Sequence, residues 1–300
     1  LAQSATVYRI FVDPGLFRKE MELIEENNQK RIEAAQQSDD PDEQPDLVDP
    51  EAVKQQLAAY LAEALELETR EVIEAAPALK IVVRAGAGYD NVDLAAATER
   101  GVVVMNTPGQ NSNAVAELAL GLMIYISRTQ FTPATGSELQ GKRLGVQAYG
   151  NVGRLVGAKA KALGMRIQAL DPFLTDQQII DGGAEHVHSV EELYGSSDFL
   201  SIHIPALPST VGSIGYDLMA RMPKGAVLVN TARKEVIDEE GLMKALEVRP
   251  DLKYVTDVMP DNYALLKEKF GLRVFATPKK MGAQTSEANV NAGLAAARQI

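Results

Sequence analysis

The fold of this 300-residue chain is decided by one stretch, Leu144-Gly145-Val146-Gln147-Ala148-Tyr149-Gly150-Asn151-Val152-Gly153. A β-rich run ends near Gln147, two glycines follow, and a helical pattern continues to Leu163. Such a turn lets the backbone approach a pyrophosphate and lets helix and strand pack closely. The pyrophosphate then lies at the helix N-terminus, where free N–H groups favour an anion. The stretch therefore predicts a dinucleotide site at Gly150 and Gly153, with Ala148 in place of a first glycine.

Asp171 supports this prediction. It ends the next β-rich run, 21 residues after Gly150, where a carboxylate accepts hydrogen bonds from the ribose hydroxyls of a dinucleotide. Because a carboxylate repels a 2′-phosphate, the sequence favours NAD over NADP as the cofactor. The alternative is a glycine-rich turn that packs without a ligand.

On both sides of this stretch, short apolar runs alternate with helical patterns. Such near-continuous apolar runs predict parallel strands buried on both faces, and hence an α/β fold. The predicted strands are residues 81–83, 102–105, 144–146, 167–170, 199–202, 226–229 and 254–256, and helical patterns cover residues 114–127, 152–163 and 240–246.

Composition excludes several classes of protein. The formal net charge of −11 argues against a nucleic-acid partner. The most apolar stretch, residues 114–126, is interrupted by Glu117 and is too short to span a membrane. There is no cysteine and there are three histidines, so the sequence predicts neither disulfides nor a metal site. The lack of cysteine fits the cytoplasm, although a leader removed before Leu1 would make an organelle lumen the location.

The first 68 residues differ from the rest. Residues 38–50 contain six acidic residues and three prolines, a composition typical of an exposed loop that buries little apolar surface.

Several motifs together, in this order, resemble one family. They are residues 84–93, 105–112, the glycine turn, and residues 205–210, 229–233, 256–258 and 282–285. The ordered set resembles the D-isomer-specific 2-hydroxyacid dehydrogenases over residues 69–300. Within that family the chain is most similar to short phosphoglycerate dehydrogenases that lack an appended regulatory domain.

The resemblance implies two Rossmann-like domains with doubly wound parallel sheets and the active site in the cleft. Residues 1–107 and 283–300 would form a discontinuous substrate-binding domain, and residues 108–282 the NAD-binding domain. The helix after Pro108 would pack against a second subunit in a homodimer. The residues that would line the NAD pocket are Gly150, Asn151, Val152, Gly153, Asp171, Ile204, Pro205, Thr231, Ala232, Asp257, Gly282 and Ala283.

Oxidation of a small anionic 2-hydroxy acid needs a group that holds the carboxylate and a base that takes the hydroxyl proton. Arg233 follows a predicted strand at its carboxyl end, where ligands of such sheets bind, and its guanidinium suits a carboxylate. The turn Gly86-Ala87-Gly88 offers backbone N–H groups to the same carboxylate. Asn106 and Arg84 are further candidates for the substrate site; alternatively, Arg84 forms an ion pair at the end of its strand.

The base is where this sequence departs from the family pattern. Most relatives have a histidine where Lys280 stands and a glutamate where Asn262 stands, with Asp261 alongside. A lysine accepts a proton only if its pKa, about 10.4, is lowered by burial or by positive charge. Arg233 and Lys279 are candidate sources of that charge. The sequence predicts Lys280 as the general base; alternatively, Lys280 only contacts the cofactor or solvent.

A second departure concerns the substrate's phosphate. The phosphoglycerate enzymes usually bind it with an Arg-Ser pair, and the equivalent positions here are Glu63 and Ala64. Lys279, Arg84 and an Arg128 from a neighbouring subunit are candidate replacements. The predicted function is NAD-dependent oxidation of D-3-phosphoglycerate to 3-phosphohydroxypyruvate in serine biosynthesis. The alternatives are a glyoxylate or hydroxypyruvate type of 2-hydroxyacid dehydrogenase, and an NAD-binding subunit without activity.

Overall fold

The computed structural model describes residues 26–31, 33, 70–89 and 91–299. The described residues belong to two compact units, one within Leu1–Arg84, Gly88–Asn106 and Gln299–Ile300 and the other within Ala85–Ala87 and Thr107–Arg298. The predicted acidic loop at 38–50 lies outside the described residues. The predicted division into substrate-binding and NAD-binding domains concerns function as well as contacts, and it stays a prediction.

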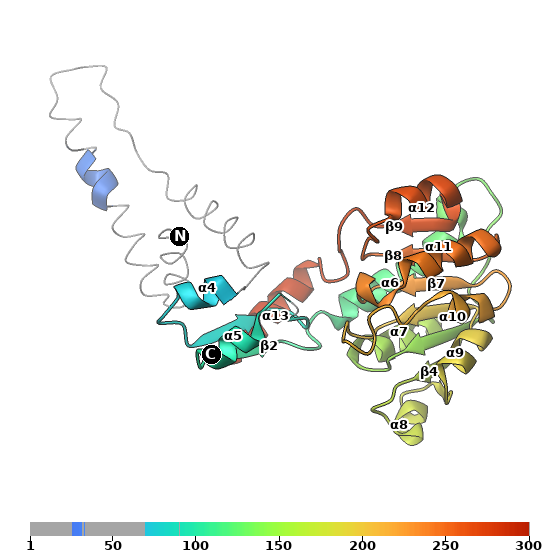
Figure 1. The fold of residues 1–300 in the computed structure, drawn as a ribbon, viewed down its shortest axis with the longest axis horizontal. Helices are drawn as coiled ribbons and strands as arrows, with labels where there is room; N and C mark the ends of the chain where they lie inside the picture. The colour runs from blue at the N-terminus through green and yellow to red at the C-terminus, as the bar shows by residue number, and fades with distance from the viewer. Residues whose placement is uncertain (1–25, 32, 34–69, 90, 300) are drawn as a thin grey trace, which may run out of the picture. The chain divides into compact units, whose positions relative to one another are not determined.

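The larger unit is built on seven parallel strands in the order β5-β4-β3-β6-β7-β8-β9 (Figure 1). They are β3 (Arg143–Gln147), β4 (Arg166–Leu170), β5 (Glu185–His186), β6 (Phe199–Ile202), β7 (Val227–Asn230), β8 (Lys253–Thr256) and β9 (Val274–Ala276). Every residue of β6 and β7 is buried, as expected of a sheet covered on both faces. The predicted α/β fold is confirmed.

The strand order reverses next to β3. From β3 the chain passes outward to β4 and β5, and it then returns to place β6 on the other side of β3. Gln147, the last residue of β3, therefore pairs with Leu170 on one side and Ile202 on the other. Open parallel sheets bind their ligands at such a reversal, outside the carboxyl ends of the strands.

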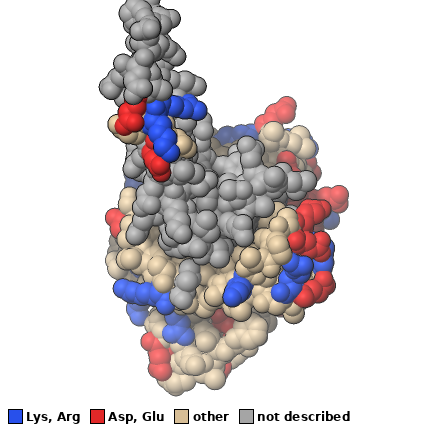
Figure 2. Space-filling model, turned by 90° about the vertical axis from the view of Figure 1, so that its left-hand side faces the viewer, with Lys and Arg blue, Asp and Glu red and all other residues tan. Residues whose placement is uncertain are grey.

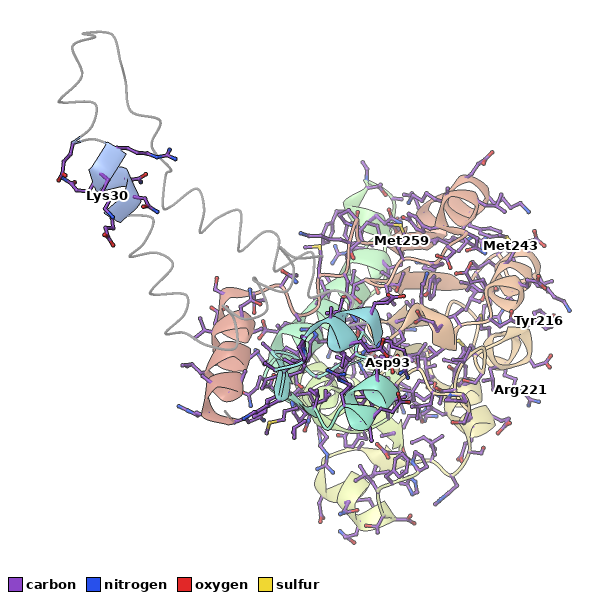
Figure 3. The ribbon with its side chains drawn as sticks, turned by 60° about the vertical axis from the view of Figure 1, so that its left-hand side comes forward. Lys30, Asp93, Tyr216, Arg221, Met243 and Met259 are labelled. Atoms are coloured by element: carbon purple, nitrogen blue, oxygen red, sulfur yellow. The ribbon has the colours of Figure 1, made fainter. Side chains whose placement is uncertain are left out.

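Helices cover both faces of this sheet. They are α6 (Ser112–Ser127), α7 (Asn151–Ala162), α8 (Asp176–Asp181), α9 (Val190–Ser196), α10 (Tyr216–Arg221), α11 (Glu239–Val248) and α12 (Tyr263–Phe270), with short 3-10 turns η1 (Thr129–Phe131), η2 (Lys234–Val236) and η3 (Gly271–Arg273). A further helix, α13 (Ser286–Gln299), follows β9 in the chain. Leu144 and Val146 join an apolar cluster with α6 and α7, whereas Leu200 and Ile202 join a second cluster with α9, α10 and α11. Neighbouring helices on the second face touch through Tyr216 of α10, whose ring lies 4.1 Å from Lys244 Nζ of α11; Figure 3 labels Tyr216.

The smaller unit contains α4 (Arg70–Ala75), β1 (Ile81–Arg84), α5 (Leu94–Glu99) and β2 (Val103–Asn106), with β1 and β2 parallel. Asp93, labelled in Figure 3, caps α5 by accepting a hydrogen bond from the Ala96 N–H at 2.8 Å. Arg70 joins α4 to α5 through Glu99, with 2.6 Å between Nη1 and Oε2. The apolar core is small and centres on Ile73, Val82 and Ala96 among others.

Among the described residues, no helix combines the length and the apolar character needed to cross a bilayer. On the face drawn in Figure 2, basic and acidic side chains are interspersed.

Candidate active site

The glycine turn lies at the strand-order reversal, between β3 and α7. Gly150 is the N-cap of α7, and no side chain caps the helix there. A Cβ at Gly153 would lie 2.2 Å from the Ala148 carbonyl oxygen, so only glycine permits this approach of helix and turn. A Cβ at Gly150 would meet no atom within 4 Å. The two glycines thus differ: Gly153 allows packing, and Gly150 leaves open space in front of the helix N-terminus.

Ala148 stands where dinucleotide turns have their first glycine. Its φ is 72°, in the left-handed region. That conformation costs a non-glycine residue about 1–2 kcal/mol. The Ala148 N–H donates to the Leu170 carbonyl at 2.9 Å and so holds the turn against the end of β4. The turn keeps its shape without its first glycine, at a cost in backbone strain.

Asp171 follows β4 and is 8% exposed. Its Oδ2 accepts a hydrogen bond from the Tyr149 N–H at 2.8 Å, and its Oδ1 accepts one from the Phe173 N–H at 2.9 Å. An ionised carboxylate has about four acceptor positions, so two remain for ribose hydroxyls. The sequence did not indicate that this carboxylate also holds the glycine turn.

Arg154, in the first turn of α7, is a candidate that the sequence analysis missed. Its Nε donates to the Tyr149 carbonyl at 3.0 Å, and its guanidinium lies 5.7 Å from the centre of the Tyr149 ring. A cation in the first turn of a helix opposes the helix dipole, whereas an anion bound there would offset it. The sequence signal was an arginine directly after Gly153.

The end of β7 carries Thr231, Ala232 and Arg233. The Asn230 side chain shapes this turn, because its Oδ1 accepts from the Ala232 N–H at 3.0 Å and its Nδ2 donates to the Arg233 carbonyl at 2.8 Å. Thr231 is 6% exposed, and its Oγ1 is buried without a hydrogen-bond partner among the described residues. Arg233 is half-buried, and its Nη1 donates to the Ala232 carbonyl at 2.8 Å.

Asp257 follows β8, the next strand of the sheet, and is 1% exposed. Its Oδ2 accepts hydrogen bonds from the N–H groups of Gly282 at 2.7 Å and Met281 at 3.2 Å. Its Oδ1 has no hydrogen-bond partner among the described residues. Burial raises the pKa of Asp257, and the two N–H groups and the charge of Lys280 oppose that rise. Asp257 Oδ1 is therefore, like Thr231 Oγ1, a buried acceptor that could bind a hydrogen-bond donor of a ligand.

Lys280 precedes Met281, whose N–H donates to Asp257 Oδ2, and the charge of Lys280 lowers the pKa of that carboxyl. Its side chain is exposed, so burial does not supply the environment that a neutral lysine needs. The preceding backbone is fixed, because Thr277 Oγ1 donates to the carbonyl of Lys279 at 2.7 Å. The role of Lys280 as a base stays a prediction.

The two positions that replace the family's glutamate differ. The Asp261 side chain accepts a hydrogen bond from Lys234 Nζ at 2.6 Å. The Asn262 backbone N–H donates to Glu239 Oε2 at 3.1 Å, whereas its side-chain Oδ1 is buried without a hydrogen-bond partner among the described residues. Met259, labelled in Figure 3, lies between Asp257 and this pair in the chain.

The segment after β6 contains His203, Ile204 and Pro205. His203 Nε2 lies 2.9 Å from Ser201 Oγ, and burial lowers the pKa of His203 to about 4. The imidazole is therefore neutral at pH 7. Ile204 is half-buried and Pro205 is exposed.

The substrate candidates Arg84 and Asn106 lie in the smaller unit, at the paired ends of β1 and β2. Gly88 belongs to the same unit, whereas Gly86 and Ala87 are counted with the larger one. Gly86 is buried, and its carbonyl accepts a hydrogen bond from the Thr107 N–H at 2.9 Å.

Comparison with known proteins shows which family has this sequence and fold. Residues 123–278 match the family model for the NAD binding domain of the D-isomer specific 2-hydroxyacid dehydrogenases. D-3-phosphoglycerate dehydrogenase of Methanocaldococcus jannaschii is 40% identical over 77% of this chain and 47% of its own length. Hydroxypyruvate reductase of Thermotoga maritima is 34% identical over 98% of this chain and 97% of its own. The chain thus spans about half the length of the first of these relatives.

Among solved structures, NAD+-bound 3-phosphoglycerate dehydrogenase of Entamoeba histolytica superimposes with a TM-score of 0.74, at 46% identity over 78% of this chain and 75% of that one. The prediction of NAD as the cofactor is confirmed by the match to this NAD binding domain and by the NAD+-bound relative. This chain belongs to the D-isomer specific 2-hydroxyacid dehydrogenase family.

Proposed function

We propose that this protein oxidises D-3-phosphoglycerate to 3-phosphohydroxypyruvate with NAD, a step of serine biosynthesis. Two buried oxygens without partners support a bound dinucleotide most directly: Thr231 Oγ1 and Asp257 Oδ1, at the carboxyl ends of the neighbouring strands β7 and β8. A buried oxygen without a partner costs roughly 1–3 kcal/mol, and N–H donors of a ligand would relieve that cost. The similarity to phosphoglycerate dehydrogenases supports the choice of substrate.

The residues of the larger unit fit NAD. The open N-terminus of α7 and Arg154 suit the pyrophosphate, and Asp171 suits the ribose hydroxyls. Thr231 and Asp257 suit the amide donors of the nicotinamide. When bound, NAD supplies the hydride acceptor. The remaining pocket residues would be Asn151, Val152, Ile204, Pro205, Ala232, Gly282 and Ala283.

The substrate would be held by its charges. Arg233 would bind the carboxylate and polarise the carbonyl that forms at C2, assisted by the N–H groups of Gly86-Ala87-Gly88 and by Asn106. Lys280 Nζ, in its neutral form, would accept the proton of the C2 hydroxyl. Lys279 and Arg84 would attract the phosphate.

A second candidate keeps the chemistry and changes the substrate to an unphosphorylated acid such as hydroxypyruvate or glyoxylate. The similarity to hydroxypyruvate reductase over nearly the whole of both chains favours it, as does the missing Arg-Ser pair. An NAD-binding subunit without turnover is the third candidate, motivated by the exposed Lys280.

Formation of NADH by the full chain separates these candidates. We expect NADH from 3-phosphoglycerate, and a large loss of turnover in Arg233→Gln with NAD affinity unchanged. Arg221→Gln is the matched control, because Arg221 is exposed at the end of α10, and it should behave as the wild type. Reduction of hydroxypyruvate or glyoxylate without turnover of 3-phosphoglycerate supports the second candidate. NAD binding without any turnover supports the third.

The proposal extends to assembly and location. We propose a homodimer formed through α6, where Ile124 is 39% exposed and Phe131, just beyond the helix, is 68% exposed. Sedimentation of the full chain measures this directly. We place the enzyme in the cytoplasm, or in an organelle if a leader precedes Leu1, with no nucleic-acid partner.

A further inference from the structure

Two of the three histidines stand one residue apart at the end of β5, the edge strand farthest from β7, β8 and β9. Side chains two residues apart on an extended segment point to the same side. The intervening Val187 is 5% exposed and packs into the core. The rings of His186 and His188 accordingly lie together, with 4.5 Å between their centres. A low histidine count argues against a metal site only if the few histidines lie apart.

Asp176, the first residue of α8, faces these rings. Its Oδ1 lies 3.0 Å from His186 Nδ1, and one ligand atom of each of Asp176, His186 and His188 lies within 4.8 Å of the others. His186 Nδ1 is buried and has no hydrogen-bond partner among the described residues. The 3.0 Å approach lacks hydrogen-bond geometry, and the pair is an ion pair when His186 is protonated. An imidazole nitrogen and a carboxylate oxygen at this separation are also ligand types that bind a shared cation.

The backbone under these three residues is fixed by helix caps. Thr175 caps α8 in a reciprocal pair with Gln178, immediately before Asp176. The His188 N–H donates to Glu192 Oε2 at 3.0 Å, while the Glu192 N–H donates to Ser189 Oγ at 3.1 Å. Figure 1 shows α8 at the edge of the larger unit, beside β4. The side chain of Asp176 is 68% exposed and that of His186 is 13% exposed, so the cluster is open to solvent on one side.

We propose that Asp176, His186 and His188 bind a divalent transition-metal ion, for which Zn²⁺ is the best match. Two imidazoles and a carboxylate suit Zn²⁺, with water completing the coordination. Bonds of about 2.0–2.2 Å require the ligand atoms to move closer by roughly an ångström, which the exposed side chains of Asp176 and His188 allow. A bound ion would tie the start of α8 to β5 and so hold the segment that leads from Asp171 to Asp176.

Calorimetric titration of the tag-free full chain with ZnCl₂ tests the proposal. We expect one equivalent to bind, with affinity falling at least about tenfold in His186→Gln and His188→Gln. His203→Gln is the matched control, because it removes the third histidine far from the cluster in the chain, and it should bind as the wild type. The acidic stretch 38–50 is identical in the wild type and all three variants. Weak Zn²⁺ binding to that stretch would therefore not change the difference in affinity between them.

A second measurement guards against variants that fold poorly. Histidine ring signals in the NMR spectrum of the wild type should shift on addition of Zn²⁺ for two histidines and not for the third. Equal Zn²⁺ affinity in the wild type, His186→Gln and His188→Gln would overturn the proposal. Absence of both heat and NMR shifts at millimolar Zn²⁺ would do the same and would leave a plain Asp176–His186 ion pair.

Discussion

At the scale of single residues, Asp257 binds the backbone of Met281 and Gly282, which lie far from it in the sequence. It was identified as a pocket residue through the family motif. Its partners, the N–H groups of Met281 and Gly282, come 24 and 25 residues later and carry no side-chain signal. Which of its oxygens is left for a ligand could therefore not be predicted, because backbone donors are the same in every sequence.

Lys280 and Lys279 offer a matched pair for testing the base. Replacing Lys280 by Met should lower kcat by about a hundredfold or more, the usual contribution of a general base, with NAD affinity unchanged. Lys279→Met should raise KM for 3-phosphoglycerate while kcat is kept, because it would lose attraction to the phosphate rather than the base. Steady-state kinetics with fluorescence titration of NADH measure both. Unchanged kcat in Lys280→Met would contradict the assignment.

Ala148 is strained, so its replacement by glycine should stabilise the protein. The left-handed φ of 72° costs alanine about 1–2 kcal/mol. Glycine removes this strain, but it makes the unfolded chain more flexible, which lowers the free energy of unfolding by about 0.4–1 kcal/mol. We expect a net gain of roughly 0.5–1 kcal/mol in the free energy of unfolding, measured by urea denaturation. Ala148→Val, with a branched side chain in the same conformation, should instead be destabilised. A loss of stability in Ala148→Gly would show that strain is absent.

At the scale of elements, apolar runs predicted β3, β4, β6, β7 and β8. The same approach missed β5 and β9, which have two and three residues. Two or three residues show no periodicity, and such strands form because a neighbouring strand provides the hydrogen bonds. The short α8 was also missed, and with it the cluster around Asp176.

The two glycines of the turn between β3 and α7 have different roles. Gly153 is needed for packing of the helix on the turn, whereas Gly150 is expected to matter for cofactor binding. Gly153→Ala should destabilise the protein by about 1–3 kcal/mol, since its Cβ would overlap the Ala148 carbonyl. Gly150→Ala should leave the melting temperature nearly unchanged, because its Cβ has open space, and should weaken NAD binding by tenfold or more. Thermal denaturation and NAD titration of both variants check this. Equal loss of stability in the two would refute the distinction.

At the scale of the whole molecule, the described residues divide between two units with separate apolar clusters. The cofactor candidates Gly150, Asp171, Thr231 and Asp257 all belong to the larger unit. The sequence predicted the parallel sheet through its strands. The order of those strands, and hence the reversal beside β3, is seen only in the structure, because periodicity does not indicate which strands are neighbours.

Calorimetry should therefore show two unfolding transitions. NAD should raise the melting temperature of only the transition with the larger enthalpy. At a free NAD concentration of a hundred times Kd, the stabilisation of the larger unit is about 2.7 kcal/mol. The smaller transition should stay where it is, because no cofactor candidate lies in that unit. One transition that moves as a whole would mean that the units unfold together.

The hydrogen bond from the Tyr149 N–H to Asp171 Oδ2 has an evolutionary consequence. A lineage that needed to accept a 2′-phosphate would have to discard the carboxylate at Asp171, and with it a tie between β4 and the glycine turn. With the proposed role of Asp171 at the ribose, cofactor preference and the hydrogen bond that holds the turn depend on the same carboxylate. A swap of preference would therefore require a compensating acceptor for Tyr149, so a single substitution leads through a weakened intermediate.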